Sequence, residues 1–139
     1  MNVLTIVLQA ALWIWFLGAV ISYRTKKFTL VDGMGVKSAE FFMLVLYSAG
    51  IAAFYVFPSA GRWILFGILM LWFVAEFMFH WRYTIFGATQ RKIDGYNKCF
   101  EGTLCVFPRR ETRLVPDLYH IVQHLLILGN IFCCLIPCS

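Results

Sequence analysis

The sequence predicts an all-α integral membrane protein, a bundle of four transmembrane helices with a long basic loop between helices 3 and 4. Composition is the first reason: 61% of the 139 residues are hydrophobic and 14% are charged. Soluble domains have about 45–50% apolar and about 25% charged residues. Long uncharged runs are the second reason, since roughly 20 apolar residues span a bilayer as a helix. Nothing in the chain is typical of a soluble domain, so we expect a single membrane domain over residues 1–139.

The placement of positive charge is the third reason. Of the 12 Lys and Arg residues, four lie from Arg24 to Lys37, seven lie from Arg82 to Arg113, and only Arg62 lies elsewhere. Basic residues in short loops mark the cytoplasmic side. We therefore expect both basic loops to be cytoplasmic and both termini to be non-cytoplasmic. Topology explains this charge, so we expect contacts with membrane lipids and no nucleic-acid partner.

Hydropathy places the four spans at residues 2–22, 39–57, 63–82 and 116–136. Ser38 is expected to cap the second helix, with Glu40 in its first turn, where a carboxylate complements the helix dipole. A tight turn that begins at Pro58 is expected to separate the second and third helices. Pro116 is expected to begin the fourth helix, because proline is favoured at the first helical position, and Pro137 is expected to end it.

The loop over residues 87–115 is long and mixes basic with aromatic and aliphatic residues. Loops of this length usually carry function or are disordered, and the composition of this loop favours function. We expect it to fold back against the membrane or over the mouth of the bundle, as a lid or a partner surface. Arg109, Arg110 and Arg113 are its candidates for binding an anionic head group. Topology and general lipid contact are the alternative explanation for these arginines.

The candidate site residues lie on the third and fourth predicted helices. His120 and His124 are four residues apart and share one helix face, and Asp117 lies three residues before His120. Glu76 and His80 are also four residues apart, on the third helix. Each helix therefore presents a carboxylate–histidine stripe.

A depth argument brings the two stripes together. A helix rises about 1.5 Å per residue, so from Arg62 at the outer face Glu76 lies about 21 Å deep and His80 about 27 Å deep. Counted from the inner face, His120 lies about 6 Å deep and His124 about 12 Å deep. In a hydrocarbon layer about 30 Å thick, His80 is then level with His120, and Glu76 is level with His124.

Ionisable residues inside a membrane tend to face the bundle interior and to mark functional sites. The sequence predicts a metal site with His80, His120, His124 and Glu76 as ligands, and with Glu76 or Asp117 as a further ligand or general base. Zinc or iron suits this mixture of imidazole and carboxylate better than manganese does. A metal-free proton-linked or hydrogen-bonded network is the first alternative, and independent structural roles for these residues are the second.

The site predicts a metal-dependent enzyme, a hydrolase or an oxidoreductase, that acts on a lipid or lipid-linked substrate near the cytoplasmic leaflet. One alternative is an oligomeric proton- or metal-linked transporter. Another is a haem-binding protein that uses His80 with His120 or His124. The last is a non-catalytic small subunit of a larger membrane complex.

Overall fold

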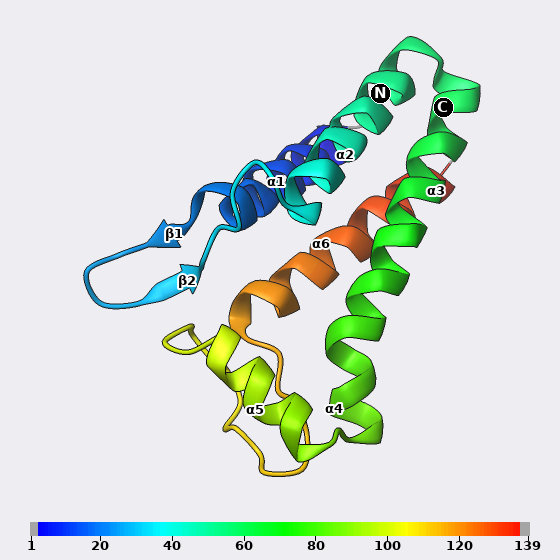
Figure 1. The fold of residues 1–139 in the computed structure, drawn as a ribbon. Helices are drawn as coiled ribbons and strands as arrows, with labels where there is room; N and C mark the ends of the chain where they lie inside the picture. Colours follow the sequence, from blue (N-terminus) through cyan, green and yellow to red (C-terminus); the bar gives the residue numbers. More distant parts are fainter. Residues whose placement is uncertain (1–2, 137–139) are drawn as a thin grey trace.

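The computed structural model describes residues 3–136 and is mostly helical (Figure 1). Its elements, in chain order, are α1 (Val3–Ile21), β1 (Tyr23–Arg24), β2 (Thr29–Val31), α2 (Ala39–Val56), α3 (Pro58–Glu76), a π-helical turn (Phe77–Trp81), α4 (Arg82–Phe86), α5 (Gln90–Cys99) and α6 (Leu118–Leu135). α3, the π-turn and α4 form one continuous helix.

Four of these helices are long and apolar enough to cross a membrane. They are α1, α2, the continuous helix Pro58–Phe86 and α6, with mean hydropathies of 2.2, 1.7, 1.8 and 1.6. This part of the predicted fold class is confirmed, and it suggests a multi-pass membrane protein.

The third helix begins at Pro58, so the predicted start at residue 63 is wrong. Proline fits the first turn of a helix, because its missing N–H would have no partner there. The residues expected to form a turn from Pro58 onward are therefore helical. Only Phe57 separates the two helices, and its N–H bonds the Ala53 carbonyl at 2.9 Å. The second helix begins as expected: Ser38 caps it by accepting a hydrogen bond from the Phe41 N–H at 3.2 Å.

The fourth helix begins at Leu118, so the predicted start at Pro116 is also wrong. Asp117 adopts an extended backbone and occupies the N-cap position, which excludes Pro116 from the first turn. Two expectations, Asn2 as the first residue of the first span and Pro137 as the end of the last, lie outside the described residues.

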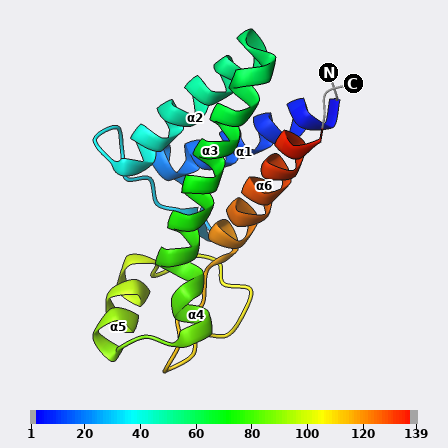
Figure 2. The ribbon, with the colours of Figure 1, turned by 90° about the vertical axis from the view of Figure 1, so that its right-hand side faces the viewer.

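The four long helices pack in the order α1, α2, α3, α6, with α6 returning to α1 (Figures 1 and 2). α2 and α3 approach most closely near their connection. A Cβ atom on Gly61 would lie 1.9 Å from the Ala53 carbonyl oxygen, and one on Gly50 would lie 2.8 Å from Ile68 Cδ1. From this connection α2 and α3 diverge toward the other end of the molecule (Figure 1).

The core combines aromatic packing with satisfied polar groups. Trp72 packs edge-on against Phe16 and Tyr47, with ring centroids 4.3 and 5.6 Å away. The Asn130 side-chain amide donates to the Leu8 carbonyl at 3.0 Å, and the Tyr47 hydroxyl lies 3.3 Å from Asn130 Oδ1. Such interhelical hydrogen bonds hold helices together where water is excluded.

The end where α2 and α3 diverge is covered by the two long connections. β1 and β2 form a short antiparallel hairpin after α1. α5 folds back across the same end and buries Ile93, and the strand region and loop meet where the Leu104 N–H bonds the Thr29 carbonyl at 3.3 Å. The expected fold-back of the long loop is therefore observed, whereas the helix inside it was not predicted.

Candidate metal centre

Glu76, His80 and His120 converge beneath α5. Each offers one potential ligand atom, and these three atoms all lie within 4.8 Å of one another. Glu76 Oε2 lies 3.6 Å from His80 Nε2, and the rings of His80 and His120 stack with centroids 4.0 Å apart. The expected meeting of His80 and His120 agrees with this contact. We call these three residues the triad.

A π-helical turn places His80 relative to Glu76. The turn spans Phe77–Trp81, and the Arg82 N–H bonds back to the Phe77 carbonyl five residues earlier. Such turns widen an α-helix by one residue and occur often at functional sites. The wider turn changes the direction of the side chains after Glu76, and His80 is the buried residue of this segment.

Asp117 orients His120. Its Oδ1 accepts hydrogen bonds from the His120 backbone N–H at 3.0 Å and from His120 Nδ1 at 2.6 Å. Burial alone would raise the pKa of Asp117, but its hydrogen bonds and charge interaction with His120 outweigh burial and hold the pKa below its ordinary value. Asp117 is therefore a carboxylate that both caps α6 and engages Nδ1, which leaves Nε2 as the free nitrogen of His120.

Tyr96 on α5 orients His80 in the same manner. Its hydroxyl is hydrogen-bonded to His80 Nδ1 at 2.9 Å, which leaves Nε2 on the side of Glu76. Burial raises the pKa of the Tyr96 hydroxyl, so it remains protonated at neutral pH. Phe100 adds ring contacts to both histidines, with centroids 6.1 Å from His80 and 5.0 Å from His120.

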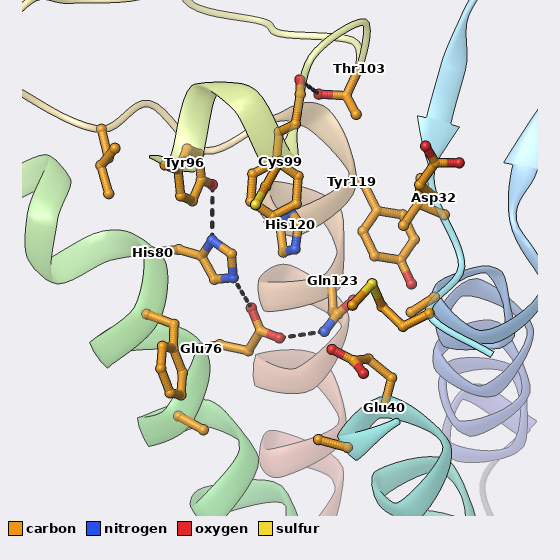
Figure 3. Close-up of a pocket in the computed structure, with 18 of the residues that line it drawn as sticks. Asp32, Glu40, Glu76, His80, Tyr96, Cys99, Thr103, Tyr119, His120 and Gln123 are labelled. Atoms are coloured by element: carbon orange, nitrogen blue, oxygen red, sulfur yellow. Dashed lines mark hydrogen bonds and ion pairs between the residues drawn. The ribbon is translucent and has the colours of Figure 1, made fainter. Parts of the chain in front are cut away.

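The Glu76 carboxylate is only partly satisfied. Its Oε1 accepts a hydrogen bond from Gln123 Nε2 at 2.6 Å (Figure 3). Its Oε2 is buried and has no hydrogen-bond partner among residues 3–136, and the same holds for Gln123 Oε1. A buried oxygen without a donor costs about 1–3 kcal/mol, more when charged. A cation beside Oε2 would remove this cost.

The ligand set matches known metal chemistry. Two imidazoles and one carboxylate bind catalytic zinc, and the same combination binds non-haem iron, with coordination positions left open. Ligands about 2.1 Å from a tetrahedral zinc lie about 3.4 Å apart. The 3.6 Å between Glu76 Oε2 and His80 Nε2 nearly meets this value. Since the three ligand atoms lie within 4.8 Å of one another, the widest pair would need to approach by at most about 1.4 Å.

The triad borders a cavity of about 920 Å³ between the divergent helices and α5. Its wall includes apolar side chains of α1, α2 and α3, together with the charged residues Glu40, Arg91 and Lys92. Figure 3 shows Tyr96, His80, Glu76 and Gln123 linked in one chain of contacts inside it.

His124 lies apart from the triad. Its ring packs on Phe73 and Trp81, with centroids 4.4 and 5.7 Å away, and its Nδ1 has no hydrogen-bond partner among the described residues. The depth argument paired Glu76 with His124, but Gln123 occupies that place. The depth argument therefore located the partner of Glu76 on α6 to within one residue. The rotation of α6 about its own axis determines that Gln123, and not His124, faces Glu76.

The three predicted head-group arginines also lie outside the cavity wall. Arg109, Arg110 and Arg113 are exposed, and Arg109 donates a hydrogen bond to the Phe100 carbonyl at 3.1 Å. The cations on the cavity wall are instead Arg91 and Lys92, in the first turn of α5, and both are exposed as well.

Sequence reasoning missed Gln123 and Tyr96. Gln123 carried a usable signal, because it is a polar residue in an apolar helix, three positions after His120. Tyr96 carried none, since its contact with His80 depends on how the long loop folds.

Comparisons with known proteins find no family model, no curated protein and no solved structure that matches this chain.

Proposed function

We propose that this protein is a membrane-embedded metalloenzyme that holds one zinc or iron ion at Glu76, His80 and His120. One observation carries the proposal: within residues 3–136, the buried Glu76 Oε2 accepts no hydrogen bond and lies 3.6 Å from His80 Nε2, and the Nδ1 atoms of His80 and His120 are already engaged. A metal-bound histidine usually donates a hydrogen bond from the N–H of its second ring nitrogen to a carboxylate or another fixed group. Asp117 and Tyr96 fill that role here.

The stacking of the two histidines favours a small ion over haem. Two axial histidines stand on opposite faces of a haem, so the macrocycle would have to lie between them. The rings of His80 and His120 are 4.0 Å apart and tilted by only 31°. A shared ion at their edges, next to Glu76, suits this arrangement.

The cavity supports a catalytic role over a purely structural one. A bound metal would lower the pKa of a coordinated water or polarise a substrate oxygen. Asp117 contacts His120 and lies off the cavity wall, so it is a positioning residue and not the general base. Glu40 is the remaining wall carboxylate without an ion pair among the described residues, since Asp32 pairs with Arg24. We assign Glu40 as the proton acceptor.

The substrate is proposed to be a lipid or lipid-linked molecule in the cytoplasmic leaflet. The cavity lies at the end of the molecule where both basic connections lie, and basic loops mark the cytoplasmic side. Most of the surface that lines the cavity is apolar. A transporter or a non-catalytic subunit would not require a metal triad that borders a cavity of this size.

Metal content tests this proposal first. The protein would be purified in lipid nanodiscs, loaded with zinc or iron, and analysed for metal per chain. We expect about one ion per chain in the wild type and in His124→Ala, and a loss of the ion in His120→Ala. His124→Ala is the matched control, because it removes an imidazole from the same helix without touching the triad.

An activity assay tests the proposed catalytic role of the metal. Loaded and chelator-treated nanodiscs containing mixed phospholipids and fatty acids would be compared by lipid mass spectrometry, with oxygen and reductant added for the iron form. A metal-dependent change in lipid composition that His120→Ala abolishes supports the enzyme. Stoichiometric metal without any lipid turnover would favour metal handling and overturn the catalytic proposal.

A further inference from the structure

A stripe of side chains along the long third helix lines part of the cavity. Trp72, Glu76, His80 and Tyr83 all line it, across the π-helical turn. Eleven residues separate the first from the last, so the stripe is roughly 16 Å long. Glu76 and His80, two members of the triad, lie in the middle of this stripe.

The Tyr83 end of the cavity carries unneutralised positive charge. Arg91 and Lys92 line it, and neither forms an ion pair with a carboxylate within residues 3–136. Lys92 Nζ is hydrogen-bonded to the Tyr83 hydroxyl and lies 4.1 Å from the centre of its ring, so it is held at the wall. Asp94, on the same helix, is engaged by Gln90 at 2.9 Å.

The carboxylates of the cavity lie elsewhere and do not cancel this charge. Asp32 pairs with Arg24 on the hairpin, Glu40 lies in the first turn of α2, and Glu76 belongs to the triad. The N-terminal end of α5 adds a partial positive charge next to the two cations. Two such cations on the wall of a cavity suit an anion.

The Trp72 end is apolar. Phe16 from α1, Met43 from α2 and Trp72 from α3 line it, and Phe16 packs on Trp72 at 4.3 Å. A volume of about 920 Å³ lies near the upper end of the range for small-molecule sites, about 300–1,000 Å³. The cavity therefore has room for a polar group at one end and a hydrocarbon chain at the other.

We infer that the ligand is an amphiphile with an anionic head group, bound by Arg91 and Lys92, whose hydrocarbon chain extends past the triad toward Trp72. This inference rests on the proposed function and names its substrate class. His80 is three residues from Tyr83, about 4.5 Å along the helix. The metal centre therefore faces the first carbons next to the head group and not the far end of the chain.

Tryptophan quenching by brominated lipids tests this inference. Nanodiscs of zwitterionic phosphatidylcholine would contain increasing fractions of either a brominated fatty acid or a brominated phosphatidylglycerol. Brominated phosphatidylcholine is the uncharged-head control. Bromine near Trp72 quenches its emission, and Trp72→Phe identifies that contribution among the five tryptophans. We expect quenching at lower lipid fractions for an anionic lipid than for phosphatidylcholine.

The double variant Arg91→Gln/Lys92→Gln should need about tenfold or more anionic lipid for half quenching, because it removes two charged hydrogen-bond donors. Arg109→Gln/Arg110→Gln is the matched control: it makes the same charge change on exposed residues off the cavity wall and should behave as wild type. The fatty acid and phosphatidylglycerol arms show which anionic lipid fits, and a response to either supports the inference.

Equal quenching by all three lipids, or an unchanged response in Arg91→Gln/Lys92→Gln, would overturn the inference. Metal content measured on the same samples separates the two proposals. Selective binding of anionic lipid by protein that cannot hold metal would overturn the metalloenzyme and leave the ligand class standing. One bound metal per chain without selectivity for anionic lipid would overturn the ligand class and leave the metal centre standing.

Discussion

Asp117→Asn isolates what the charge of Asp117 contributes to the metal centre. Asp117 Oδ1 accepts from both the backbone N–H and Nδ1 of His120. Asparagine keeps an oxygen for the cap and is as good an N-cap as aspartate, so the helix should persist. The lost negative charge should lower metal affinity by about 10–100-fold, which corresponds to about 1.4–2.7 kcal/mol.

The matched variant is Asp117→Ala, which also removes the cap. It should lose metal affinity to at least the same extent and also lose about 0.5–2 kcal/mol of stability in the metal-free protein. Affinity would be measured by competition with a chromophoric zinc chelator, and stability by thermal unfolding of the metal-free protein in detergent. A zinc affinity in Asp117→Asn within twofold of wild type would refute the assignment of Asp117 as the group that orients His120.

Three further substitutions test other parts of the account. Tyr96→Phe removes the hydroxyl beside His80 but keeps the ring, so zinc affinity should fall about tenfold in the same chelator competition; an unchanged affinity would count against this contact. His124→Ala should retain one metal per chain while losing about 1 kcal/mol or more of stability on heating, and loss of the ion would return this residue to the ligand set. Gly61→Ala should cost about 1–3 kcal/mol, because its new Cβ would meet the backbone of α2. Gly67→Ala, on the same helix with open space around it, should be neutral or gain up to about 1 kcal/mol, and equal effects would contradict the close packing.

The helical architecture and the level of the site could be read from the sequence. Long apolar runs and basic loops predict four spans, and four helices of suitable length and hydropathy are present. A constant rise per residue fixes depth, so His80 and His120 could be expected to meet. Hydropathy and the rise per residue do not depend on how a helix packs against its neighbours, so they can be used without a structure.

Rotation about the helix axis could not be read in this way. His124 and Gln123 differ by one position along α6, but only Gln123 faces Glu76. The π-turn before Arg82 also shifts the face on which His80 lies, and periodicity assumes a regular helix. Packing with the other helices settles these angles.

The long loop limited the sequence interpretation most. Apolar residues in it predicted a fold-back but not α5, whose helix places Tyr96 against His80 and Arg91 and Lys92 on the cavity wall. Arg109 and Arg110 were predicted to bind an anionic head group because two adjacent basic residues are typical of such sites. Their exposure follows from the path of the chain after α5, which spacing alone does not encode.

The X-ray absorption spectrum of the zinc-loaded protein tests the central claim most directly. We expect two imidazole nitrogens and at least one carboxylate oxygen at about 2.0–2.2 Å from the ion, with one imidazole lost in His120→Ala and none lost in His124→Ala. A spectrum with sulfur ligands, or one without imidazole scattering, would contradict the metal centre formed by Glu76, His80 and His120.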